Sequence, residues 1–244
     1  MSAAFKGSLD FLTRRPIAHR GLHDGNQTVW ENTMSAFRAA RDAGFGIECD
    51  VHLSADDVPV VFHDSTLDRV TNETGRLCDR TAGELAKIAV GGTADHIPSL
   101  TDLLDLVAGA VPLVIEMKSD SATNDAHFLA TLLPLVAGYG GPLALMSFDE
   151  GLIAQALAAH PPCPIGLTAE GTAPAEFARH RRVFERGCSF VSYNVHHLPN
   201  PFISWVRDDE KLPVICWTVR TPQDVAVSNA HADQMTFEGL RPGP

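Results

Sequence analysis

The 244-residue chain has no apolar run long enough to cross a membrane. Apolar segments such as residues 112–115 and 142–146 fall far below the ~18 apolar residues that a spanning helix requires. Residues 1–15 also lack the apolar stretch of a signal peptide. We therefore expect a soluble, cytoplasmic protein that carries no membrane anchor.

Basic residues are scarce, since 19 lysines and arginines stand against 30 aspartates and glutamates and give a formal net charge of −11. Nucleic acids and anionic membranes are bound by basic surfaces that displace counterions, so we expect neither as a partner. If the ligand is a small anion, the chain must concentrate positive charge locally to bind it.

Several cofactor and metal motifs are missing. The five cysteines are scattered and form no CxxC pair, which favours reduced, mostly buried thiols over a zinc site or a disulfide framework. The segment HRGLHDG is not the GxGxxG of a dinucleotide-binding fold, and no GxxxxGK[ST] P-loop occurs. Rossmann and P-loop folds therefore lose their specific support.

The pattern that is present alternates short β-type runs with Ala/Leu-rich stretches of helical character. The composition, 45% hydrophobic and 20% charged, is that of a globular protein with a large core. The predicted strands are residues 16–20, 46–53, 111–118, 142–148, 164–168, 190–194, 213–219 and 233–237. The predicted helices are residues 31–43, 99–108, 124–137, 149–159, 174–186, 201–207 and 221–229. Eight repeats in this length favour an α/β fold of the closed (β/α)8 TIM barrel type, with residues 1–244 as a single domain.

Two parts of the chain break this alternation. Too few residues follow the last strand to form a helix, so we expect residues 9–13 to cover that flank of the barrel. A polar insertion over residues 64–98 follows a strand-like segment at 59–63. The insertion is either a substrate loop on the C-terminal rim or a solvated excursion that holds one short helix at 82–88.

Polar clusters lie at the C-terminal ends of several predicted strands. The clusters are His19-Arg20, Glu48 with Asp50, His63-Asp64, and Glu116 with Lys118. The active sites of βα barrels lie at this face, whereas polar residues that serve solubility would favour the helices. We therefore expect the four clusters to form one site.

The carboxylates of these clusters favour a metal site. Residues two apart on a strand point to the same side, so Glu48 and Asp50 face together and Glu116 joins them from the next strand. Three carboxylates suit one hard divalent cation, Mg²⁺ or Ca²⁺, which would also relieve their mutual repulsion. The alternative is a buried network of ion pairs with arginine or lysine.

The histidines and basic residues of the clusters indicate phosphate chemistry. His19 and His63 could be packed core or surface residues, but their place at the rims of neighbouring strands favours acid–base catalysis. Arg20 and Lys118 supply local positive charge, and an arginine fork suits a phosphate. They could also pair with nearby carboxylates such as Glu31.

Six short segments follow one another in a fixed order. They are His19-Arg20-Gly21, Glu31-Asn32-Thr33, Glu48-x-Asp50-Val51, His63-Asp64, Glu116-x-Lys118 and Trp217-Thr218-Val219. This series resembles the signature segments of the glycerophosphodiester phosphodiesterases, which are metal-dependent (β/α)8 barrels. The resemblance runs from Ile17 to about Gly239, nearly the whole chain. The chain departs from the family's TD[YF]P-like turn at residues 236–239, where an acidic residue is retained one place later, so this turn does not fix the head group.

The resemblance implies metal-dependent hydrolysis of a glycerophosphodiester to an alcohol and glycerol 3-phosphate. The alternatives are a phosphodiesterase for a lysophospholipid or a sugar-linked phosphodiester, and a non-catalytic barrel that binds phosphate esters. His19 and His63 would be catalytic, and Glu48, Asp50 and Glu116 would bind the cation. The residues expected around the substrate are Arg20, Glu31, Lys118 and Trp217.

Overall fold

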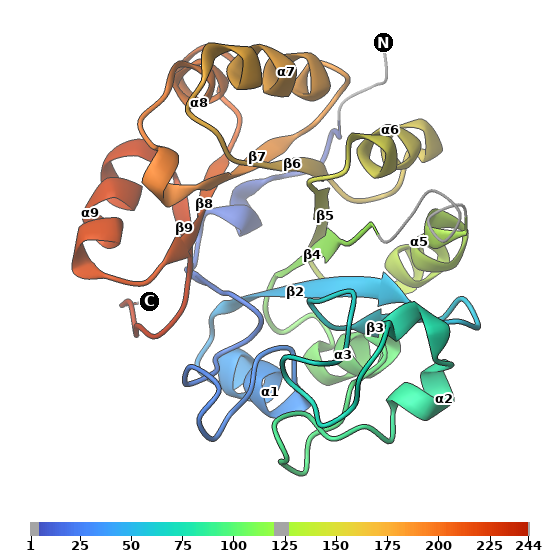
Figure 1. Ribbon diagram of the computed structural model, residues 1–244. Helices are drawn as coiled ribbons and strands as arrows, with labels where there is room; N and C mark the ends of the chain where they lie inside the picture. Colours follow the sequence, from blue (N-terminus) through green and yellow to red (C-terminus); the bar gives the residue numbers. More distant parts are fainter. Residues whose placement is uncertain (1–4, 120–126, 244) are drawn as a thin grey trace.

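The computed structural model describes residues 5–119 and 127–243. Eight of its strands run parallel and close into a barrel, because β1 pairs with β2 on one side and with β9 on the other. These strands are β1 (Ile17–Ala18), β2 (Gly46–Leu53), β4 (Leu113–Met117), β5 (Leu143–Ser147), β6 (Ile165–Ala169), β7 (Phe190–Asn194), β8 (Val214–Val219) and β9 (Gln234–Phe237). Helices lie around the barrel (Figure 1), so the predicted (β/α)8 fold is confirmed.

A helix follows each parallel strand from β1 to β8. The helices are α1 (Met34–Asp42), α3 (Leu100–Val107), α5 (Phe128–Gly138), α6 (Glu150–Ala159), α7 (Pro174–Phe184), α8 (Pro201–Ser204) and α9 (Pro222–His231), with the short turns η3 (Val195–His197) and η4 (Trp205–Asp209) beside α8. Thr33, Ser99, Asp149 and Thr221 each cap a helix by accepting a backbone N–H of its first turn. Residues 124–126 of one predicted helix lie outside the described residues. No helix in residues 5–119 or 127–243 is both long and apolar enough to span a membrane.

Strand alternation separates the hydrophobic core from the polar interior of the barrel. On β2, Cys49 and Val51 are fully buried in the core between the sheet and the helices. Glu48 and Asp50 alternate with them and therefore point into the barrel. On β4, Glu116 pairs in register with Asp50. The sequence thus brings the three carboxylates to neighbouring positions inside the barrel.

The segment before β1 closes the barrel interior at the N-terminal ends of the strands. It forms the short helix η1 (Asp10–Leu12), and Leu12 is fully buried. Leu12 packs with interior residues of several strands, including Ile17, Val114, Phe190 and Ile215. The prediction that residues 9–13 cover the outer flank beside the last strand is wrong. Their apolar side chains instead cover the N-terminal end of the barrel interior and shield it from water.

The insertion at residues 64–98 follows an extra strand, β3 (Pro59–Val61), which pairs antiparallel with β2. It contains η2 (Leu77–Asp79) and α2 (Ala82–Leu85), which is shorter than the predicted helix at 82–88. Its buried apolar residues form a hydrophobic cluster of their own with Val60 and Phe62. The insertion is therefore a packed unit beside the C-terminal end of β2 and not a solvated excursion.

Candidate active site

A cavity of about 170 Å³ lies at the C-terminal ends of the barrel strands. Seven of the nine predicted site residues line it, namely His19, Arg20, Glu48, His63, Glu116, Lys118 and Trp217. The other two, Glu31 and Asp50, both form ion pairs with Arg20. The structure therefore brings all nine predicted residues to one place.

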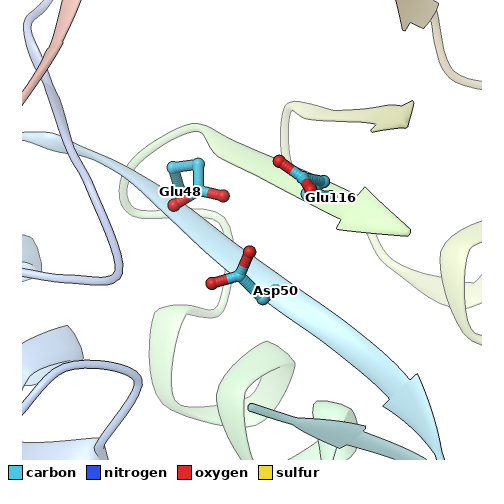
Figure 2. Close-up of side chains that lie close together, drawn as sticks. All are labelled: Glu48, Asp50 and Glu116. Atoms are coloured by element: carbon cyan, nitrogen blue, oxygen red, sulfur yellow. The ribbon is translucent and has the colours of Figure 1, made fainter. Parts of the chain in front are cut away.

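The acidic centre of this site consists of Glu48, Asp50 and Glu116. Figure 2 shows the first two on β2 and the third on the adjacent β4, and each offers one oxygen atom within 4.8 Å of the others. All three residues are buried, with at most 6% of their surface exposed. Three clustered carboxylate oxygens form the kind of ligand set that hard divalent cations prefer.

Asp50 is compensated by neighbouring cations. The Nε atom of Arg20 lies 3.2 Å from Oδ2, and the Nζ atom of Lys118 lies 3.0 Å from Oδ1. The side-chain amide of Asn32 also donates to Oδ2 at 2.8 Å. Burial opposes ionisation, but the charges of Lys118 and Arg20 hold the pKa of Asp50 well below its ordinary value of 3.8. Because Lys118 also donates to Glu116, ion pairing accounts for two of the three carboxylates.

Glu48 lacks a comparable partner. Its Oε2 atom accepts a hydrogen bond of 3.0 Å from the backbone N–H of Arg20, whereas Oε1 has no hydrogen-bond partner among the described residues. Burial and the negative charges of Asp50 and Glu116 raise the pKa of Glu48 well above its ordinary value of 4.5. A buried carboxylate with an open oxygen beside two others fits a bound divalent cation, and ion pairing alone does not account for it.

His19 is held by a carboxylate from the far end of the chain. Its Nδ1 atom lies 2.5 Å from Oε1 of Glu238, and Arg220 donates to the other carboxylate oxygen of Glu238 at 2.7 Å. The Nε2 atom of His19 lies 3.8 Å from Oε2 of Glu48. Burial, with a smaller contribution from the charge of Arg20, lowers the pKa of His19 below 6.5. The ring therefore presents Nε2 to the acidic centre.

His63 has a similar arrangement at a more exposed position. Its Nδ1 atom lies 2.6 Å from Oδ1 of Asp64, and 31% of its side chain is exposed, against 10% for His19. Burial and the charges of Lys118 and Arg20 lower the pKa of His63 below 6.5. Each histidine thus uses Nδ1 to contact a carboxylate and keeps Nε2 for the cavity.

Arg69 in the insertion connects two parts of the site. Its guanidinium donates to both carboxylate oxygens of Glu31, at 2.9 and 2.7 Å, and to both of Asp64, at 2.7 and 3.0 Å. Glu31 in turn accepts a 2.7 Å hydrogen bond from Arg20. Burial opposes ionisation of Glu31, but Arg69 and Arg20 lower its pKa to about 2. Arg69 therefore links Asp64, the partner of His63, to Glu31, the partner of Arg20.

Two aromatic residues, Trp217 and Phe148, also line the cavity. The rings of Trp217 and Phe148 meet edge to face with their centroids 5.4 Å apart. The indole Nε1 of Trp217 donates to the backbone carbonyl of Ser192 at 3.3 Å, which fixes the ring over β7. Phe148 is 44% exposed, so this aromatic pair extends from the cavity to the surface.

Several residues that contact the predicted site residues had no role assigned to them from the sequence. They include Asn26, Asn32, Asp64, Arg69 and Glu238. Asp64 had a signal, because it follows His63 directly, and Glu238 was visible as the acidic residue of the divergent turn. Arg69 had none, since its two partners lie five and 38 residues away in the sequence.

The fold and the site together define a (β/α)8 barrel with an acidic centre and two carboxylate-bound histidines at the C-terminal ends of its strands. The chain belongs to the glycerophosphoryl diester phosphodiesterase family, whose sequence model matches residues 19–238. The matched region contains every residue of the predicted site.

Two curated relatives show the extent of the sequence similarity. The chain is 48% identical over 73 residues to glycerophosphodiester phosphodiesterase 1 of Bos taurus, which covers 30% of this chain and 21% of that protein. It is 40% identical over 111 residues to the glycerophosphodiester phosphodiesterase of Caldanaerobacter subterraneus, which covers 42% of this chain and 44% of that protein. The chain thus matches about a fifth of the mammalian protein and under half of the bacterial one.

Two solved structures share the whole fold. One is a phosphodiesterase of Oleispira antarctica in complex with the product sn-glycerol-3-phosphate, at a TM-score of 0.79 and 22% identity over 93% of this chain and 94% of that chain. The other is the glycerophosphodiester phosphodiesterase of Thermotoga maritima. Its TM-score is 0.74 and its sequence identity is 21%, over 92% of this chain and 94% of that chain. At these identities the likeness supports the barrel fold.

Proposed function

We propose that this protein hydrolyses glycerophosphodiesters to an alcohol and glycerol 3-phosphate, with one divalent cation, Mg²⁺ or Ca²⁺, bound by Glu48, Asp50 and Glu116. The observation that carries the proposal is one cavity that joins this acidic centre to two carboxylate-bound histidines. Family membership supports it, as do the names of the relatives and the sn-glycerol-3-phosphate complex of the Oleispira protein.

The basic side chains of the site would bind the phosphate. Arg20 and Lys118 line the cavity, and their carboxylate partners Glu31, Asp50 and Glu116 hold them in place. When bound, a divalent cation supplies Lewis-acid stabilisation of negative charge on the phosphoryl group. Fixed charges aimed at a centre where charge develops are effective because they need no reorganisation during the reaction.

The two histidines would divide proton transfer between them. His19 lies beside Glu48 and is almost fully buried, which suits a base that acts next to the acidic centre. His63 is more exposed, which suits an acid that protonates the alcohol as it leaves toward solvent. A barrel that only bound phosphate esters would not need two histidines oriented in this way.

Turnover and metal removal test the proposal together. The purified protein should release glycerol 3-phosphate from glycerophosphocholine with Mg²⁺ or Ca²⁺, and chelation should abolish this while the circular dichroism spectrum is kept. Full activity after chelation, with the absence of metal confirmed by elemental analysis, would remove the cation from the mechanism. Binding without turnover under every metal would favour a binding barrel. Activity on lysophospholipids or sugar-linked diesters alone would change the substrate class.

The cytoplasmic location and the single-domain organisation stay predictions of the sequence.

A further inference from the structure

Two buried hydroxyl groups line the inner part of the cavity without a partner. Ser192 on β7 and Thr236 on β9 are 0% and 1% exposed, and both line the cavity. The Oγ atom of Ser192 and the Oγ1 atom of Thr236 make no hydrogen bond to any described residue. A buried hydroxyl without a partner is costly, and a ligand in the cavity would supply the partner that these two lack.

The strand pattern directs both hydroxyls into the barrel. Ser192 follows Phe190 by two residues on β7, and Phe190 belongs to the interior apolar cluster. Thr236 pairs in register with Ile17, another member of that cluster, while the next residue, Phe237, packs in the outer core. The two side chains therefore occupy the inward positions of strands that flank β8.

The cavity is divided electrostatically. The carboxylates lie on β2 and β4, and His19 and Arg20 directly follow β1. Strands β5 to β9 contain no charged residue, and the charge of Arg220, which follows β8 and also lines the cavity, is paired with Glu238. A phosphate therefore belongs to the charged half of the cavity, and the neutral half with Ser192 and Thr236 suits a neutral polar group.

We propose that Ser192 and Thr236 bind the hydroxyl groups of the glycerol unit, which deepens the proposed function and rests on it. Serine and threonine hydroxyls donate and accept hydrogen bonds, as the hydroxyls of a polyol do, so the pairing needs no charge. The variable alcohol then lies toward the mouth, beside the exposed Phe148 and His63. The glycerol half is thereby recognised at a closed surface and the head group at an open one.

The test compares two ligands that share a three-carbon phosphate ester and differ in their hydroxyls. The dissociation constants of sn-glycerol 3-phosphate and n-propyl phosphate are measured by calorimetry on the Mg²⁺-loaded protein. The wild type should bind glycerol 3-phosphate more tightly. Ser192→Ala and Thr236→Val should each reduce this preference by about three- to tenfold, the loss expected for one hydrogen bond.

Ser189→Ala is the matched control. Ser189 is also buried, and its Oγ atom also has no partner among the described residues, but it does not line the cavity. This variant should keep the wild-type preference. Because each variant removes an unpartnered hydroxyl, thermal unfolding should confirm that all three fold.

The possible results separate the two proposals. An equal loss of affinity for both ligands, or no change in the preference for either variant, would overturn the glycerol subsite. A wild type without preference for glycerol 3-phosphate would do the same. A reduced preference in the two variants, together with no hydrolysis of glycerophosphocholine by the wild type, would support the subsite and contradict the proposed function.

Discussion

The Nδ1 atom of His19 lies 2.5 Å from Oε1 of Glu238, although 219 residues separate the two in the sequence. The same relationship recurs between His63 and Asp64, which are neighbours in the sequence. In both pairs the carboxylate fixes the ring and leaves Nε2 for the cavity. One histidine receives its partner from a local turn, and the other receives it only because the barrel closes.

The first prediction concerns the division of proton transfer between the histidines. If His63 is the acid, His63→Ala should lower kcat/KM on glycerophosphocholine by ~10² to 10⁴, because an alkoxide must be protonated as it leaves. It should lose much less on bis(p-nitrophenyl) phosphate, whose leaving group departs unaided. His19→Ala should lose activity on both substrates, since removal of a proton from the nucleophile is needed in either case.

The measurement is kcat/KM of both variants on both substrates at saturating metal. Recovery on the aryl substrate by His19→Ala instead would reverse the assignment. Recovery by neither variant would show that this pair does not work as acid and base.

The second prediction separates two carboxylates that look alike in the sequence. Glu48→Gln and Asp50→Asn should both weaken metal binding sharply, because each removes a charge from a hard-cation site. Without metal, Glu48→Gln should keep or raise the melting temperature, since it relieves repulsion at an uncompensated oxygen. Asp50→Asn should lower stability by about 3 kcal/mol, because it leaves Arg20 and Lys118 short of a partner.

Thermal and urea unfolding in the presence of chelator, with metal affinity from calorimetry, check this contrast. Equal destabilisation by both amides would instead indicate that Glu48 belongs to a structural ion-pair network.

The third prediction concerns acid stability and Glu31. Its pKa is lowered from 4.5 to about 2 in the folded protein, so the ionised form stabilises the fold by roughly 3 kcal/mol. A lowered folded-state pKa gives stability that is complete above the unfolded value and is lost as pH falls toward the folded one. The free-energy difference between wild type and Glu31→Gln should therefore be constant above about pH 5 and shrink below it. Urea unfolding from about pH 7 to pH 3.5 measures it, and a pH-independent difference contradicts the assignment.

The fourth prediction tests Arg69 as a positioning residue. Arg69→Met should lower kcat/KM by about tenfold, since Asp64 and Glu31 lose the group that holds them at the site. Arg69→Lys should recover little, because lysine cannot span two carboxylates with a planar fork. Arg80→Met is the control, since Arg80 also lies in the insertion but pairs only loosely with Glu73, at 3.7 Å. Equal effects of Arg69→Met and Arg80→Met would assign Arg69 a role in the stability of the insertion alone.

The sequence by itself determined the barrel and the acidic centre. Eight strand-like runs with helices between them fixed the closed parallel fold, and alternation on β2 placed Glu48 and Asp50 on one face. These features are local, because a period of two or 3.6 residues can be read from neighbours in the chain. The contact between His63 and Asp64 is predictable for the same reason, because the two residues are neighbours in the chain.

Tertiary structure alone decided which side chains complete the site. Closure of β9 on β1 brings Glu238 to His19, and the fold of the insertion brings Arg69 to Glu31. It also decided that η1 fills the N-terminal end of the barrel interior and that Oε1 of Glu48, unlike either oxygen of Asp50, has no ion-pair partner among the described residues. Such contacts join residues that are distant in sequence, and their geometry depends on how strands and loops pack, which no local pattern records.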